Sequence, residues 1–137
     1  MLQRKFTNVL AAEVLVNSST GKGIGYSTGA GSYVTQATNR ATGVTINSLT
    51  GQITTHNASL AAEGSAEFIV TNSKVNINDV VALSIQSGAV GVGTMATVST
   101  VTNGSFTIRV HNGNVAAGTA ETGAIIINFV VLKGASL

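Results

Sequence analysis

The segment 97–110, TVSTVTNGSFTIRV, constrains the fold more than any other part of the sequence. Phe106, Ile108 and Val110 alternate with polar residues, a period of two that is typical of a strand with one buried face. Asn103-Gly104 lies between two such runs and is the strongest short-range signal for a two-residue β-hairpin, in which both residues are expected to adopt positive φ. The chain is therefore predicted to contain a hairpin that packs one face against a core.

Other segments show the same period of two. In 80–87 the apolar residues Val81, Leu83 and Ile85 share one side, as Phe68 and Val70 do in their own segment. Shorter strands are predicted at 31–38, 44–47 and 52–56, and residues 57–64 are predicted to form a short helical or irregular turn. About eight short strands without a long helix predict an all-β fold, a jelly-roll-like antiparallel β-sandwich.

The last predicted strand, AIIINFVVLK, is apolar on both faces. One face carries Ile125, Ile127, Phe129 and Val131, and the other carries Ile126, Val130 and Leu132, interrupted by Asn128. A strand that is apolar on both faces is expected to be covered on both. In a two-sheet protein the second face is covered either by another chain or by the N-terminal segment of the same chain. The first reading makes Ile126, Val130 and Leu132 candidate interface residues.

Two regions are predicted along the chain. Residues 1–28 are rich in Gly and Ser towards their end and are expected to form an extended or flexible arm, in which Phe6, Val9 and Leu10 are candidate contact residues that fit either a helical turn or a strand. Residues 29–137 are expected to form the sandwich. Its predicted core residues are Phe68, Val70, Leu83, Ile85, Phe106, Ile108, Val110, Ile125, Ile127 and Phe129.

The N-terminal sequence MLQRKFTNVLAAEVLV begins basic and turns apolar, as signal peptides do. Glu13 interrupts its apolar run too early for the unbroken core of about 7–15 residues that a signal peptide needs. No stretch approaches the roughly 20 apolar residues of a membrane span. We therefore expect neither a signal peptide nor a membrane partner.

Charged residues are scarce, at 9% of the chain, and the net charge is +2. Proteins usually contain about a quarter charged residues, and sparse charge favours association. Either the surface is solvated by Thr, Ser and Asn, or much of it faces other subunits. The basic residues are scattered and lack interleaved aromatics, which argues against a nucleic-acid partner.

The residues that usually carry catalysis form no recognisable constellation. The five carboxylates are Glu13, Glu63, Glu67, Asp79 and Glu121, and such residues are expected to be solvated surface charges. A metal site could use His56 and His111 if the fold joined them, but both are expected to cap strand ends. Cysteine is absent, and no Gly-x-Ser-x-Gly elbow supports a serine nucleophile. We expect no enzyme activity, cofactor, metal or small-molecule substrate.

Three motifs resemble ligand-binding loops, but each lacks a required feature. The GKGIG stretch at 21–25 lacks the spacing of a phosphate-binding loop. The segment 91–96, GVGTMA, loosely matches a dinucleotide pattern, but a strand-like run follows it, so its glycines are expected to form turns or close backbone approaches. Asn76, Asn78 and Asp79 resemble part of a calcium loop with too few carboxylates.

A long part of the chain resembles a family of small proteins that is common in tailed-phage and prophage genomes. The shared frame is G-x-G-x-x-V-T-Q-A-T-x-x-x-T-G-V-T, followed by T-G-Q-I-T and an Asn-Ala-x-Leu-Ala segment. In this chain it occupies Gly29, Gly31, 34–38, 42–45, 50–54 and 57–61, and the likeness resumes at 79–81, 104–110 and the ending AIIINFVVLKGAS. The resemblance covers roughly residues 29–136 and contains no catalytic residue.

The resemblance implies a virion structural protein. We expect a capsid decoration (cement) protein on the outer capsid surface, which self-associates, taken to be a homotrimer, and binds the phage major capsid protein. The alternative is a tail or fibre surface domain that recognises a host receptor or glycan, with Tyr26 and Tyr33 as its exposed aromatics.

Overall fold

The structure is a computed structural model that describes residues 24–26, 28–115 and 117–136. Every regular element in these ranges is a β-strand, and none is a helix. The eight strands are β1 (Gly31–Thr35), β2 (Val44–Thr45), β3 (Thr50–Thr54), β4 (Ser65–Thr71), β5 (Val80–Ser87), β6 (Thr94–Thr102), β7 (Ser105–Asn112) and β8 (Ile126–Leu132).

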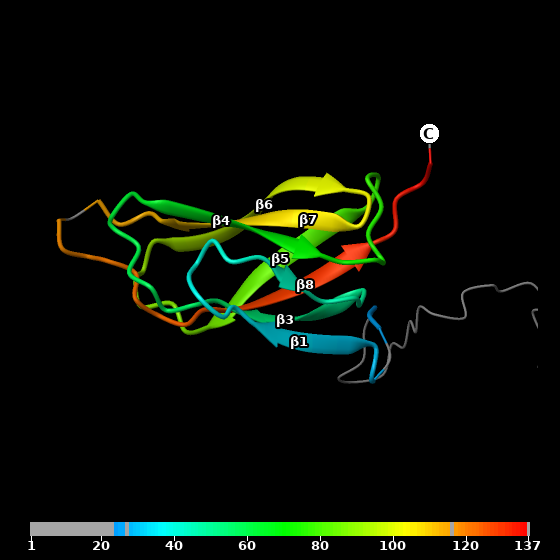
Figure 1. Cartoon of the computed structure of the whole chain (residues 1–137), viewed down its shortest axis with the longest axis horizontal. Helices are drawn as coiled ribbons and strands as arrows, with labels where there is room; N and C mark the ends of the chain where they lie inside the picture. The colour runs from blue at the N-terminus through cyan, green and yellow to red at the C-terminus, as the bar shows by residue number, and fades with distance from the viewer. Residues whose placement is uncertain (1–23, 27, 116, 137) are drawn as a thin grey trace, which may run out of the picture. The chain divides into compact units, whose positions relative to one another are not determined.

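The strands form two four-stranded sheets packed face to face (Figure 1). The strand order is β1-β3-β8-β5 in the first sheet and β2-β4-β7-β6 in the second. Except for the β6–β7 hairpin, consecutive strands lie in opposite sheets. The all-β sandwich predicted from the sequence is therefore confirmed.

Two pairings differ from the antiparallel pattern that was expected throughout. β1 pairs with β3 in parallel, and β2 pairs with β4 in parallel, whereas the other four pairings are antiparallel. The connections explain the difference. β1 and β3 are separated in the chain by β2 in the other sheet, so the chain crosses the sandwich and returns in the same direction.

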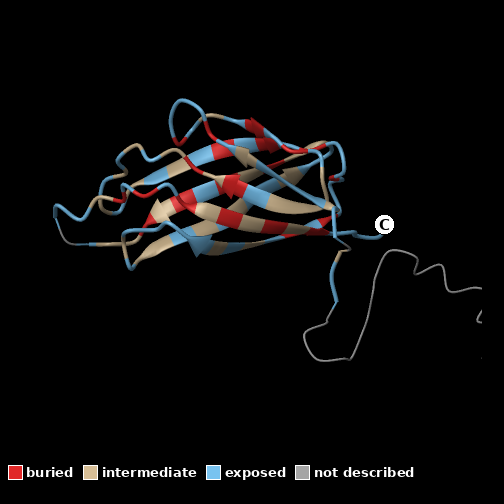
Figure 2. Cartoon of the chain, turned by 90° about the horizontal axis from the view of Figure 1, so that it is seen from below, coloured by how far each residue is buried: buried red, intermediate tan, exposed pale blue. Residues whose placement is uncertain are grey.

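The core lies between the sheets, where buried residues alternate with more exposed ones along β7, β8 and the second half of β4 (Figure 2). Eight of the ten predicted core residues are buried to 2% exposure or less, while Leu83 and Ile85 are partly buried against the same cluster. The rings of Phe106 and Phe129 join the two sheets, with centroids 5.5 Å apart. The sequence pattern did not single out Val44, Ile46, Ile53 and Val75, which complete the core with Val81 and Val131.

The predicted hairpin at Asn103-Gly104 joins β6 to β7, with Thr102 opposite Ser105. Gly104 has a φ of +82°, but Asn103 does not have positive φ, so the expectation of a turn with two positive φ values was wrong. A value near +80° at the second central residue alone is typical of a type II turn. Loop 72–79 supports this geometry, because Val75 O accepts from Gly104 N and Ile77 N donates to Asn103 Oδ1.

Residues 57–64, predicted to form either a short helical turn or an irregular one, are irregular. They form an isolated bridge between Leu60 and Glu121. The arm contacts predicted at Phe6, Val9 and Leu10 lie outside the described residues. The predicted division at residue 28 likewise remains a prediction.

Candidate interaction face

The candidate site is the outer face of sheet β1-β3-β8-β5, hereafter the β8 face. Its residues are identified by the pairing register, which aligns Thr50 with Val130 and Ala82, and Gln52 with Asn128 and Ser84. The predicted interface residues Ile126, Val130 and Leu132 all belong to it. The full set is Gly31, Tyr33, Thr35, Thr50, Gln52, Thr54, Val80, Ala82, Ser84, Gln86, Ser87, Ile126, Asn128, Val130 and Leu132, in which Gln86 is placed at a bulge in β5 by its hydrogen bond to Gln52.

The apolar part of the β8 face lies at the C-terminal end of β8. Leu132 is 53% exposed and pairs directly with Val80, which is 59% exposed. Val130 is half-buried and pairs with Ala82 in the next row. Ile126 shares the face but is separated from Val130 by Asn128. The structure therefore places the three predicted residues on one face and joins two of them into one patch.

The middle of the β8 face is polar and hollow. Gln52 Nε2 donates to Gln86 Oε1 across β8 at 2.8 Å. Tyr33, on the edge strand β1, is 85% exposed and lies next to Gln52 in the register. An open hollow of about 460 Å³ occupies this region and is lined by Thr50, Gly51, Gln52, Ala82, Leu83, Ser84, Asn128, Phe129 and Val130.

No residue of the β8 face carries a charged side chain. The outer face of the other sheet differs, because it holds the exposed ion pair of Arg109 and Glu67, with Nε and Oε1 2.8 Å apart. His111 adds a hydrogen bond to Ser65 on that face. The two outer faces therefore differ in polarity, and the β8 face is the one suited to contact another uncharged surface.

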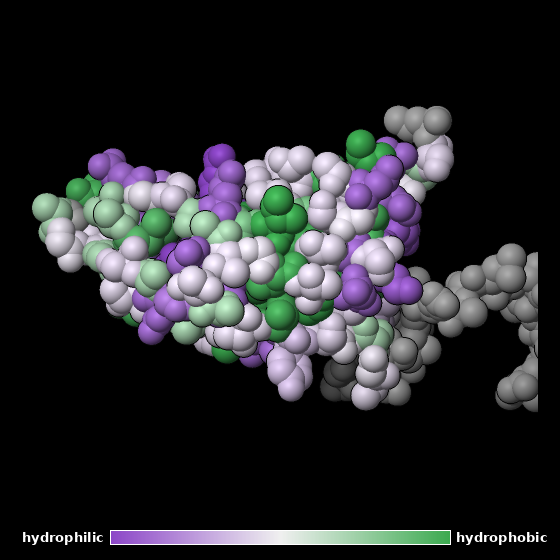
Figure 3. Space-filling model, viewed as in Figure 1, coloured by the Kyte–Doolittle hydropathy of each residue, from purple (hydrophilic) through white to green (hydrophobic). Residues whose placement is uncertain are grey.

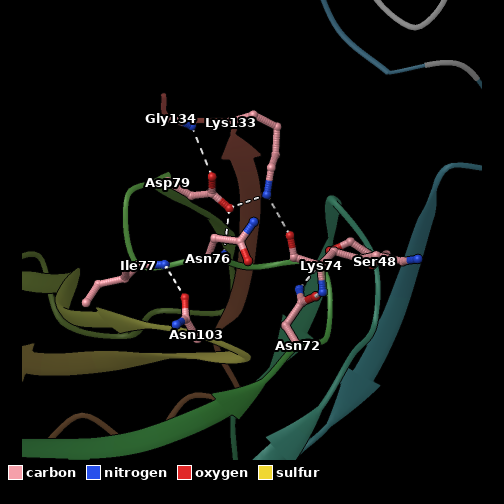
Figure 4. A network of polar contacts seen from close by, with 9 residues as sticks. All are labelled: Ser48, Asn72, Lys74, Asn76, Ile77, Asp79, Asn103, Lys133 and Gly134. Carbon is pink, nitrogen blue, oxygen red and sulfur yellow. Dashed lines mark hydrogen bonds and ion pairs between the residues drawn. The ribbon is translucent and has the colours of Figure 1, made fainter. Parts of the chain in front are cut away.

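The end of the sandwich near the C-terminus is held by Asp79 (Figure 4). Its carboxylate accepts from Asn76 N at 2.8 Å and from Gly134 N at 3.0 Å, and it pairs with Lys133 Nζ, which also donates to Lys74 O. Burial by itself raises the pKa of Asp79, but these hydrogen bonds and the Lys133 charge outweigh it, so the pKa is lowered. The Asp79 oxygens, which a calcium loop would offer to the metal ion, are instead bonded to Asn76, Lys133 and Gly134 of the chain itself.

The opposite end is organised around a second buried carboxylate, Glu121. Its side-chain oxygens accept hydrogen bonds from Val90 N, Gly91 N, Gly123 N and Thr94 Oγ1. Burial by itself raises the pKa of Glu121, but the bonds from Thr94, Gly91, Gly123 and Val90 lower it to about 2. This carboxylate is a structural anchor that joins the β5–β6 loop to the segment before β8.

Arg40 lies beside this anchor and is 4% exposed. It donates to the carbonyl oxygens of Ala58, Glu121 and Gly123 and to Thr55 Oγ1. Burial lowers the pKa of Arg40, and the Glu121 charge opposes this. Because a buried charge must be compensated, Arg40 and Glu121 stabilise the loops around them together.

The expectation that the carboxylates are solvated was wrong for Glu121 and Asp79, which are 0% and 6% exposed. Both carboxylates are buried because backbone N–H groups donate hydrogen bonds to them, together with Lys133 for Asp79 and Thr94 for Glu121. The local signal for Glu121 is the turn ETG, in which the carboxylate accepts from the N–H two residues later. Glu67 and Glu63 are exposed, as expected.

The remaining predicted motifs have local structural roles. His56 follows β3 and its Nδ1 accepts from Ala58 N, whereas His111 lies on β7. Gly93 approaches the backbone of Gly113, whose N–H donates to Gly93 O at 3.0 Å, so the expected close backbone approach is confirmed. Within the described ranges, no three His, Cys, Asp or Glu residues are grouped as metal ligands would be. The same ranges contain no helix able to span a membrane.

Comparison with protein-family models gave no match, and neither a curated protein nor a solved structure is significantly similar to the chain. These comparisons do not test the resemblance to tailed-phage virion proteins, which stays a prediction from the sequence.

Proposed function

We propose that this chain is a capsid decoration (cement) protein of a tailed-phage virion. It self-associates through the β8 face and binds the outer surface of the lattice formed by the major capsid protein. The observation that carries the proposal is the β8 face, which is uncharged throughout and apolar at Val80, Val130 and Leu132. The resemblance to phage virion proteins supports it independently.

The size of the β8 face indicates how it is used. Four strands spaced by about 4.8 Å, with lengths from five to eight residues at roughly 3.3 Å per residue, give a projected area of roughly 400 Å². A stable interface buries about 800 Å² of each partner. The face is therefore one component of the contact, and the apolar arm residues Phe6, Val9 and Leu10 are candidates for another.

The proposed mechanism is mechanical rather than chemical. Apolar burial contributes about 25 cal/mol per Å², and a decoration protein repeats the same contact at every equivalent lattice site. The sum of many such contacts resists outward pressure from packaged DNA. A surface with few charges suits close packing against identical copies, because interface cores are depleted of charged residues.

The decisive test is the location and copy number of the protein in purified particles. A decoration protein is expected in a copy number comparable with that of the major capsid protein, and on the outside of the head. A handful of copies on the tail, or no incorporation, would contradict the proposal.

The β8 face is tested by a matched pair of substitutions. We expect Leu132→Asp, combined with Val80→Asp, to convert the oligomer to monomer in sedimentation velocity, because it places charges in the apolar patch. Ile69→Asp is the control, since Ile69 is 56% exposed on the outer face of the other sheet. Equal oligomer size for the two variants would exclude the β8 face as the self-association surface.

A second function, glycan recognition by a tail or fibre domain, is favoured by one observation. Tyr33 is 85% exposed beside a hollow lined by the amides of Gln52 and Asn128 and the hydroxyl of Ser84. An aromatic ring with neutral donors and acceptors around it suits a sugar. This function predicts that the purified protein binds host surface glycans and that Tyr33→Ala abolishes the binding.

A further inference from the structure

Three valines project from the end of the sandwich that carries Glu121. Val90 and Val92 of the β5–β6 loop are 65% and 102% exposed, and Val115 of the β7–β8 loop is 81% exposed. These three residues are hereafter the valine tip. The β7–β8 loop, in orange, extends at the left of Figure 1, and Figure 3 shows hydrophobic residues on the surface at that end.

The two loops of the valine tip lie side by side. Gly113 N donates to Gly93 O at 3.0 Å, and a Cβ on Gly91 would come within 2.4 Å of Asn114 Nδ2. The base of the second loop is fixed as well, because Glu63 N donates to Asn114 O at 3.1 Å. The valines therefore project from one joined structure.

A buried charge holds the valine tip in place. The Glu121 carboxylate accepts from Val90 N and Gly91 N at 3.0 and 2.9 Å, and it also binds Thr94 at the start of β6. The side chains of the valines are largely exposed, so the Glu121 anchor positions the β5–β6 loop with Val90 and Val92, and the Gly113–Gly93 hydrogen bond ties the loop of Val115 to it. A preorganised apolar group loses less entropy when it binds, which favours affinity.

The surrounding charges indicate what the valine tip contacts. Loops 88–93 and 113–120 contain no Lys, Arg, Trp, Tyr or Phe, whereas loops that insert into membranes typically combine bulky apolar residues with basic ones. Glu121, which binds the tip directly, is buried. The exposed charged residue in the backbone contacts of the tip is Glu63, whose carboxylate would be repelled by anionic lipid. The tip therefore fits an apolar protein pocket better than a bilayer.

The end of the sandwich opposite the valine tip is charged rather than apolar. β5 begins after Asp79 and ends at Ser87, just before the valine tip, so the Asp79–Lys133 pair and the tip lie at opposite ends. Lys74 and Lys133 lie at the Asp79 end, where Figure 3 shows hydrophilic residues near the C-terminus. This polarity orients the charged end towards solvent and the tip towards a partner.

We propose that the valine tip is the docking element for an uncharged apolar pocket on a capsid lattice subunit, a contact separate from self-association through the β8 face. The inference rests on the proposed function, which requires one surface for identical copies and a second for the lattice. Burial of the valine side chains supplies its affinity.

The test uses the full chain and particles stripped of the protein. The triple variant Val90→Ser, Val92→Ser and Val115→Ser is expected to bind particles about a thousandfold more weakly than the unmodified chain, because each buried valine ordinarily contributes about a tenfold factor. Its oligomer size and thermal unfolding should be unchanged, since all three side chains are exposed. The control is Ile77→Ser with Ile69→Ser, two exposed isoleucines away from the tip, which should bind as the unmodified chain does.

The outcomes separate the two proposals. If the unmodified chain does not bind particles, the decoration function fails. If it binds and the triple variant binds equally well, the decoration function stands and the tip is not the docking element. Loss of self-association in the triple variant would instead assign the tip to a second copy, and flotation of the unmodified chain with phosphatidylglycerol vesicles would assign it to a membrane; either result overturns the inference.

Discussion

At the scale of single residues, Glu121 shows how a chain with few charges uses one of them. Its carboxylate is 0% exposed, yet it accepts four hydrogen bonds from three backbone N–H groups and one hydroxyl. Burying a carboxylate is unfavourable unless hydrogen bonds replace its water. The hydrogen bonds to Glu121 stabilise its charged form strongly enough to lower its pKa from 4.5 to about 2. The charge thereby fixes a loop that has almost no apolar packing of its own.

The lowered pKa predicts acid sensitivity. A group whose pKa is depressed by folding stabilises the fold fully above its unfolded pKa, and the stabilisation is lost as the pH falls through its folded value. For Glu121 that window runs from 4.5 down to about 2, and it corresponds to about 3 kcal/mol. We expect Glu121→Gln to lower the free energy of unfolding at pH 7 by about 2–4 kcal/mol. The NH₂ group of the Gln side chain would replace an accepting oxygen and would face N–H and O–H groups that also donate.

Urea unfolding followed by circular dichroism between pH 2 and pH 7 measures both effects. The acid dependence of the Glu121→Gln variant should be shallower than that of the unmodified chain, with the remainder due in part to Asp79. Glu67→Gln removes an exposed ion pair and should cost less than about 1 kcal/mol. An unchanged pH profile in Glu121→Gln would show that this carboxylate does not stabilise the fold.

At the scale of elements, the strands with a strong period of two were predictable, and β4, β5, β7 and β8 lie where their patterns placed them. The parallel pairings were not, because β2 has two residues and its partner is fixed by the path of the chain rather than by local sequence. The double apolar character of β8 identified the candidate face. The burial of Arg40 could not be predicted, because all its partners are distant in sequence. For Glu121 only the turn at Gly123 is local, and its other partners lie about 30 residues away.

One strand position is predicted to be intolerant of any side chain. Gly51 in β3 pairs with Phe129, and a Cβ there would lie 2.5 Å from Ser32 O, 2.9 Å from Ile46 Cδ1 and 3.0 Å from Phe129 Cε1. We expect Gly51→Ala to destabilise the fold by about 1–3 kcal/mol, because the neighbours must move to accept it.

Thermal unfolding checks this prediction, with an expected fall in Tm of about 5 °C or more. Gly31→Ala is the matched control on the neighbouring strand, where the nearest atoms would be 3.5 Å away. A Tm for Gly51→Ala within about one degree of the control would mean that β1 and β3 separate easily, and the edge of the β8 face would then be adaptable.

At the scale of the whole molecule, the distribution of charge matters more than its total. Eight of the charged residues lie beyond residue 30, and Arg40, Asp79 and Glu121 among them are buried. Arg109 pairs with Glu67 on the outer face of the second sheet, and Lys133 pairs with Asp79 at one end. Neither the β8 face nor the loops of the valine tip carry a charge. Contacts made through these surfaces must therefore depend on apolar burial and neutral hydrogen bonds.

This distribution predicts how the proposed self-association responds to salt. Charge-mediated contacts weaken as ionic strength rises, because salt screens exposed charges, whereas apolar contacts are unaffected by NaCl and strengthened by sulfate. We expect the dissociation constant of the oligomer, measured by sedimentation velocity, to change by less than about twofold between roughly 0.05 and 0.5 M NaCl and to decrease in ammonium sulfate. A tenfold weakening in NaCl would place the contact on charged residues, such as Glu67 and Arg109 of the opposite sheet, instead of on the β8 face.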